Sequence, residues 1–200
     1  MIVLTSNGLS SEKLMAEMKK HVTMGKAALV VTADNIYKEK NYHVERLTKE
    51  LEQIGLNVEC FDFDTHSSSE LAQYDVVELI GGNPYYLLHS IRKNGYAQVL
   101  AEFAKNRIII GCSAGALVLT PSLHLIDLYS PEMNVVHLED LTACGLTNIH
   151  LLPHYSKFLN RYECFEEKCV LYEQANGCDV IRLNDGEGVF IHEMDITIVR

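Results

Sequence analysis

The chain contains no apolar run approaching the roughly 20 residues that a membrane-spanning helix requires. It also lacks a cluster of lysine and arginine, and its formal net charge is −10. Nucleic acids and anionic membrane surfaces both require a basic face, so we expect neither as a partner. Segment 1–8 has no basic residues ahead of its apolar run. We interpret it as a first strand rather than a signal peptide.

A second absence concerns the six cysteines, none of which belongs to a C-x-x-C pair. Several lie inside apolar runs, where a free thiol behaves as a small hydrophobic side chain. The sequence therefore favours a reduced, cytoplasmic protein. A zinc site made from Cys164, Cys169 and Cys178 would lack the usual ligand spacing. No G-x-G-x-x-G follows the first strand, so we expect neither a metal nor an organic cofactor.

No repeat, low-complexity segment or linker divides the 200 residues, and 48% of them are hydrophobic. We therefore expect a single α/β domain over residues 1–200. Strand and helix patterns alternate along the chain, which implies a mainly parallel, doubly wound sheet with flanking helices. The predicted strands are 2–5, 27–32, 58–63, 75–80, 107–110, 148–152, 179–183, 189–191 and 196–199. The predicted helices are 11–22, 42–54, 84–93, 99–104, 116–119 and a long helix over 157–175.

The most informative motif is Gly111-Cys112-Ser113-Ala114-Gly115, which has the form G-x-S-x-G. It joins an apolar strand to a helix-compatible segment, and this is the context of a nucleophile elbow. Glycine at both ends permits a sharp turn with close backbone packing, where a Cβ would clash. The turn would raise the Ser113 hydroxyl above the sheet at a helix start, where developing negative charge is favoured. A turn that merely connects a strand to a helix is the alternative interpretation.

A serine hydroxyl is a poor nucleophile unless a base removes its proton, so a histidine must lie nearby. His154 is the strongest candidate of the nine histidines, because it follows a proline at the end of an apolar run. A carboxylate must then orient the imidazole and stabilise its charged form. The alternative histidines are His124, His150 and His192, and the candidate acids are Asp127, Glu132, Asp185 and Glu187.

The oxyanion of an acyl-transfer intermediate requires two backbone donors. The N–H of Ala114, directly after the nucleophile, supplies one. The segment Gly81-Gly82-Asn83 is a candidate for the other, because it ends a predicted strand at the same edge of the sheet. Asn83 also suits a helix N-cap and Pro84 the first helical position, so these residues could simply begin a helix.

Taken together, these segments resemble the peptidase E family of serine peptidases, which includes aspartyl dipeptidases and cyanophycinases. That family's fold is related to class I glutamine amidotransferases. The resemblance implies Ser113 as nucleophile, His154 as base, and Ala114 with Gly81-Gly82 as the oxyanion hole. It also implies a small, acidic peptide substrate and a homodimer. The matching segments are Ile80-Gly81-Gly82-Asn83, Leu87-Leu88, Gly111 to Ala116, and Pro153-His154-Tyr155.

The chain departs from the dipeptidases in one region. There, an acid follows the elbow helix shortly after an arginine that recognises the substrate aspartate. In an ungapped alignment these positions carry Leu128 and His124, and Asp127 lies one residue short. A histidine would bind a carboxylate less firmly than a bidentate arginine. In the cyanophycinase branch the acid follows a later strand, a place that Asn184-Asp185-Gly186 resembles, so we expect Asp185, ahead of Asp127, to orient His154.

The sequence therefore predicts a serine-type hydrolase that cleaves a small peptide. Two alternatives remain at this stage. One is a carboxylesterase of the α/β-hydrolase type, in which His192 would be the base. The other is a non-hydrolytic binding or regulatory protein built on the same scaffold.

Overall fold

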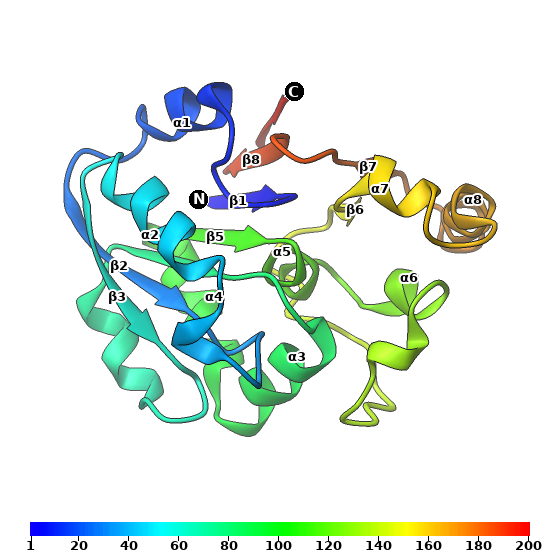
Figure 1. The fold of residues 1–200 in the computed structure, drawn as a ribbon, viewed down its shortest axis with the longest axis horizontal. Helices are drawn as coiled ribbons and strands as arrows, with labels where there is room; N and C mark the ends of the chain where they lie inside the picture. The colour runs from blue at the N-terminus through cyan, green and yellow to red at the C-terminus, as the bar shows by residue number, and fades with distance from the viewer.

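The fold is organised around a seven-stranded sheet in a computed structural model that describes residues 1–200 (Figure 1). Five neighbouring strands are parallel, β8 is added antiparallel to β1, and β9 antiparallel to β8. A mainly parallel α/β sheet was expected and is confirmed. In order across the sheet the strands are β3 (Leu56–Phe61), β2 (Gly25–Val30), β4 (Val76–Leu79), β5 (Ile108–Cys112), β1 (Ile2–Thr5), β8 (Gly188–His192) and β9 (Asp195–Val199). A separate parallel pair consists of β6 (His150–Leu152) and β7 (Val180–Arg182).

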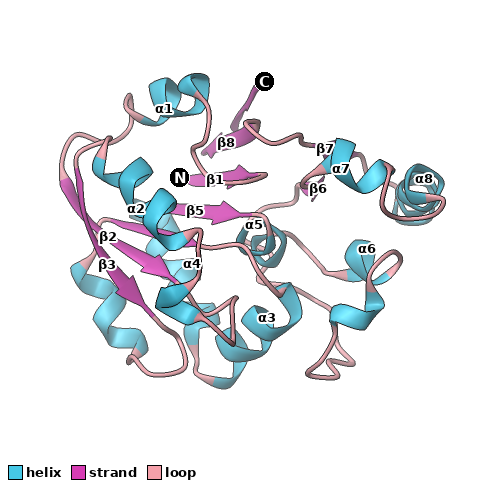
Figure 2. Ribbon diagram, in the orientation of Figure 1, coloured by secondary structure: helices cyan, strands magenta, loops and turns pink.

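Helices surround the strands, as Figure 2 shows. No helix is both long and apolar enough to cross a membrane. The α-helices are α1 (Glu12–Met18), α2 (Val44–Glu52), α3 (Pro84–Lys93), α4 (Tyr96–Asn106), α5 (Ala114–Leu119), α6 (His124–Asp127), α7 (Tyr155–Leu159) and α8 (Phe165–Asn176). Three short 3-10 helices span Lys38–Lys40, Ser68–Gln73 and Pro131–Met133.

The strand order explains where a site can form. The chain moves from β1 through β2 to β3 in one direction, then returns through β4 to β5. Right-handed crossovers then place α1 and α2 on one face of the sheet and α3, α4 and α5 on the other. Consistent with this, α2 packs on β2 and β3, and α3 packs on α5. The chain therefore leaves β1 and its neighbour β5 toward opposite faces, and a crevice opens between their carboxyl ends.

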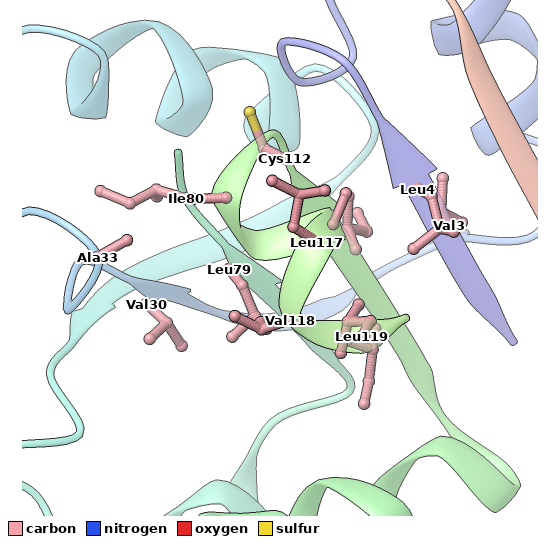
Figure 3. Packing of buried hydrophobic residues seen from close by; sticks show 14 of the residues in the cluster. Val3, Leu4, Val30, Ala33, Leu79, Ile80, Cys112, Leu117, Val118 and Leu119 are labelled. Atoms are coloured by element: carbon pink, nitrogen blue, oxygen red, sulfur yellow. The ribbon is translucent and has the colours of Figure 1, made fainter. Parts of the chain in front are cut away.

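The core of the molecule is one cluster of 55 buried hydrophobic residues. The β4 and β5 strands are largely buried on both faces because helices cover each side of a parallel sheet, and their one charged residue is Glu78 of β4. Figure 3 shows how the short α5 helix fits into this core, with Val118 beside Leu79 of β4. The helix contacts β4, β5 and β1. The turn that precedes α5 therefore rests on a rigid base.

One predicted element is wrong. The sequence pattern indicated a single helix over 157–175, but the chain forms α7 and α8 with a break between them. Cys164 at the break adopts a left-handed conformation with φ of 51°, which no continuous α-helix permits. The rings of Tyr162 and Phe165 lie 5.1 and 4.9 Å from the ring of Tyr129, so packing on this aromatic cluster accompanies the break.

Candidate active site

The G-x-S-x-G motif forms a tight turn between β5 and α5. Ser113 has φ of 51° and ψ of −108°, a strained conformation for a residue with a side chain. Its N–H donates to the carbonyl of Thr5 at 3.0 Å, which ties the turn to the end of β1. A Cβ on Gly115 would lie 2.1 Å from the carbonyl oxygen of Leu79, and one on Gly111 only 2.6 Å from the α5 backbone. Both glycines are therefore required for the helix to pack this closely.

The His154 side chain faces Ser113 from across the crevice. His154 follows the end of β6 and precedes α7, and its Nε2 lies 2.9 Å from the Ser113 Oγ. Its backbone has φ of 56°, in the left-handed region. The arrowheads of β1 and β5 in Figure 1 point toward the side where β6 and α7 lie. Because Ser113 follows β5 and His154 follows β6, their contact lies at the carboxyl edge of the sheet.

Asp185 completes a chain of three side chains. Its Oδ1 lies 2.6 Å from the Nδ1 of His154. The parallel pairing of β6 with β7 explains this contact, because Leu152 is in register with Arg182 and the two strands end side by side. A proton on Nδ1 would face the carboxylate, and in that tautomer Nε2 is free to accept a hydrogen bond from the Ser113 hydroxyl.

The surroundings of Asp185 keep its carboxylate charged. Burial opposes ionisation, but hydrogen bonds from Lys157, Ser6 and His154 outweigh it and lower the pKa of Asp185 to about 2. Lys157 holds Oδ2 from α7, and the Ser6 hydroxyl donates to Oδ1 at 2.8 Å. The carboxylate is therefore anionic throughout the physiological pH range and can stabilise an imidazolium.

Backbone donors are available beside Ser113. The N–H of Gly82 makes no hydrogen bond within the chain, and Ala114 is the first residue of α5, where an N–H has no intrahelical partner. Gly82 has φ of 147°, and a Cβ there would lie 2.4 Å from the carbonyl oxygen of Ala33, so only glycine fits. Gly81 also lines the crevice, and a Cβ on it would lie 3.3 Å from the Cβ of Ser113.

Asn83 is not available for the same role, contrary to expectation. Its N–H donates to the carbonyl of Ala33, and its side-chain oxygen caps α3 by accepting from Tyr85 and Tyr86. Its amide group donates to the carbonyl of Met133. Asn83 is therefore fully engaged as the N-cap of α3, which is the alternative role that the sequence indicated for it.

The other candidate residues lie elsewhere. Asp127 accepts from the Tyr85 hydroxyl at 3.0 Å, so the structure does not bring it to His154. His124 lies on the same short helix and does not line the cleft that contains Ser113. His192 packs near His21 at the opposite end of the sheet, as expected for the last residue of a strand antiparallel to β1. His150 interacts with the Tyr172 hydroxyl. No group of three or more potential ligands is arranged to hold a metal ion.

The Ser113, His154 and Asp185 side chains lie in a cleft of about 870 Å³. Phe158 and Tyr162 supply an aromatic wall, and Glu132 and Arg161 supply charges. The Arg161 guanidinium lies 5.3 Å from the centre of the Tyr162 ring and makes no ion pair with a carboxylate of the chain. A second hollow of about 600 Å³ between α1 and α2 contains none of the three. The size and charges of the first cleft suit a small polar molecule.

Sequence reasoning missed two residues that contact Asp185. Ser6 is fully buried at the end of β1, and Lys157 lies on α7. The position of Ser6 directly after a strand that neighbours β5 was the one available signal, because side chains at the carboxyl ends of parallel strands converge. Nothing in the sequence indicated a role for Lys157, because the single helix predicted over 157–175 lacked the break between α7 and α8.

An α/β sheet that carries a serine, a histidine and an aspartate in hydrogen-bonded sequence at its carboxyl edge belongs to the class of serine hydrolases. The comparisons with known proteins narrow this class. The model of peptidase family S51 matches residues 2–199, and the chain belongs to that family. It is a serine-type peptidase, and the resemblance to peptidase E that the sequence motifs indicated is confirmed.

Individual relatives agree with this assignment. The chain is 28% identical over 204 residues to the uncharacterised peptidase Lmo0363 of Listeria monocytogenes, covering 100% of this chain and 98% of the relative. It is 27% identical over 134 residues, 64% of each chain, to the uncharacterised peptidase PM1590 of Pasteurella multocida. A crystal structure of a peptidase E protein from Listeria monocytogenes superposes with a TM-score of 0.79 at 26% identity, covering 100% of this chain and 97% of that one. A peptidase from an acI-B1 actinobacterium shares the fold, with a TM-score of 0.71 at 15% identity over 99% of this chain and 86% of that one.

Proposed function

We propose that this protein is a dipeptidase-like serine peptidase in which Ser113 is the nucleophile, His154 the general base and Asp185 the orienting acid. The observation that carries the proposal is the continuous hydrogen-bonded path from Asp185 through His154 to Ser113, with atom separations of 2.6 and 2.9 Å. Both separations are within the range in which a proton can be transferred without movement of the backbone.

The proposed reaction follows from these positions. Nε2 of His154 takes the hydroxyl proton as Ser113 Oγ bonds to the scissile carbonyl carbon, and the N–H groups of Gly82 and Ala114 stabilise the oxyanion. The resulting imidazolium gives its proton to the leaving amine. Water, deprotonated by His154 in the second half, then releases the acyl group and restores the serine.

We infer a short peptide substrate from the walls of the cleft. An aromatic side is formed by Phe158 and Tyr162, and Glu132 and Arg161 present opposite charges near it. Charges of both signs within a small cleft suit a peptide that carries both an α-amino group and a carboxylate. Because Arg161 is not paired with a carboxylate of the chain, we expect it to bind an acidic group of the substrate. It would take the role of the substrate-binding arginine of the dipeptidases, whose position carries His124 in this chain.

The mechanism is tested by Ser113→Ala and His154→Ala. Both should lower the hydrolysis of a panel of acidic and neutral dipeptides by at least roughly 1,000-fold. A fluorophosphonate probe should label the wild type and leave Ser113→Ala unlabelled. His192→Ala serves as the control, because a carboxylesterase mechanism through His192 would make this variant the inactive one. Hydrolysis by Ser113→Ala at the wild-type rate would end the proposal.

Two further expectations belong to this proposal. We propose a homodimer, and the unpaired outer edge of β9 offers a surface for it, since Ile196 and Ile198 are exposed there. Light scattering at micromolar concentration would measure the mass. We also propose a cytoplasmic location, which is compatible with six unpaired cysteines.

A further inference from the structure

Ser6 is a buried polar residue that the proposed mechanism does not use. It follows β1 directly, its side chain is inaccessible to solvent, and its N–H donates to the carbonyl of Glu187 at 3.2 Å. A hydroxyl at such a position must find partners within the protein, because a buried polar group without a hydrogen bond is destabilising.

The partners of the Ser6 hydroxyl are the two non-nucleophilic members of the triad. Its Oγ accepts from the backbone N–H of His154 at 2.9 Å and donates to Oδ1 of Asp185 at 2.8 Å. The same Oδ1 accepts from Nδ1 of His154, which lies 3.4 Å from the Ser6 Oγ. In the tautomer with a proton on Nδ1, the hydroxyl proton of Ser6 has only the carboxylate as its acceptor.

We infer that Ser6 is a positioning residue for the reaction, which fixes the backbone of His154 and the carboxylate of Asp185 at the same time. This inference rests on the proposed function of the triad. The His154 backbone is left-handed, a conformation that is unfavourable for a residue other than glycine. A hydrogen bond to its N–H from a fixed strand end offsets this cost.

The end of β1 therefore positions both halves of the site. The carbonyl of Thr5 accepts from the N–H of Ser113, and the hydroxyl of the next residue holds His154 and Asp185. A single rigid strand end thus sets the distance between the nucleophile and its base. Loss of the Ser6 hydroxyl would leave the hydrogen bond between Ser113 and Thr5 intact, but would release His154 and Asp185 from the end of β1.

The test is Ser6→Ala, with Ser6→Cys as a second variant that keeps the side-chain volume but donates only weakly. The readout is the rate of labelling by a fluorophosphonate, with its saturation constant, from pH 5 to pH 9. We expect the limiting rate to fall roughly 10- to 100-fold in both variants, with little change in the saturation constant.

The matched control is Ser90→Ala, which truncates another buried serine, on α3. It should label at the wild-type rate, and melting temperatures should establish that each variant is folded. A limiting rate within about twofold of wild type in either Ser6 variant would overturn the inference. If Ser113→Ala is also labelled, the triad itself is wrong. If Ser113→Ala is silent while Ser6→Ala behaves as wild type, only the role of Ser6 is lost.

Discussion

Glu78 should make this protein less stable as the pH rises, and Glu78→Gln should abolish that loss. Glu78 lies in the middle of β4, wholly inaccessible to solvent, and neither of its carboxylate oxygens has a hydrogen-bond partner. Burial raises the pKa of Glu78 to about 8, and the charge of Glu50 adds to this effect, while Arg46 opposes it. Arg46 gives little relief because it is already paired with Glu50 on α2.

The sign of the effect follows from the direction of the pKa shift. The unfolded chain releases the Glu78 proton near pH 4.5, but the folded protein holds it up to about pH 8. Stability that is fully present below pH 4.5 is therefore lost between these two values. The penalty from ionisation is below about 1 kcal/mol at pH 5, about 3 kcal/mol at pH 7 and about 5 kcal/mol above pH 8. The penalties at pH 7 and above are large fractions of the free energy of unfolding of an ordinary domain.

Urea unfolding of the wild type and Glu78→Gln at half-unit steps from pH 5 to pH 9 measures this penalty. Glutamine has nearly the same shape and cannot ionise, so the difference between the two proteins isolates Glu78 from every other titrating group. The variant should gain about 3 kcal/mol over the wild type at pH 7 and less than about 1 kcal/mol at pH 5. Glu163→Gln, a change at an exposed site, should show no such trend. A pH-independent difference between wild type and Glu78→Gln would refute the assignment of a protonated, buried carboxyl.

Two other substitutions test the elbow and the acid. Gly115→Ala should lower stability by about 2 kcal/mol or prevent folding, because the new Cβ would lie 2.1 Å from the carbonyl of Leu79; a melting temperature equal to wild type would contradict the close packing. Asp185→Asn should reduce kcat by roughly 1,000- to 10,000-fold because the amide favours the wrong histidine tautomer, whereas Asp127→Asn should stay within about threefold of wild type. If Asp127→Asn lost more activity than Asp185→Asn in a dipeptide assay, Asp127 on α6 would be the orienting acid instead.

Where local patterns determine structure, the sequence was sufficient. The strand over 2–5 and the helix over 84–93 were predicted with the observed bounds, because apolar β-branched residues mark the first and an Asn-Pro start marks the second. The elbow was found for the same reason, since its glycines and its neighbours are contiguous. The long helix over 157–175 failed because no glycine or proline marks its break. That break involves a left-handed Cys164 and ring contacts with Tyr129, some 35 residues earlier in the chain.

The choice between Asp127 and Asp185 shows why the rest of the site was beyond local reasoning. Both carboxylates follow apolar segments, and no property of either segment ranks one above the other, so the preference for Asp185 came from the resemblance to cyanophycinases alone. The difference arises from the pairing of β6 with β7, in which Leu152 and Arg182 are in register. The N–H of Tyr155 then donates to the carbonyl of Leu183, so the two chains continue side by side beyond their last paired residues. A parallel pair only three residues long thus delivers an imidazole and a carboxylate to one point, and pairing between distant segments is the information that a single sequence withholds.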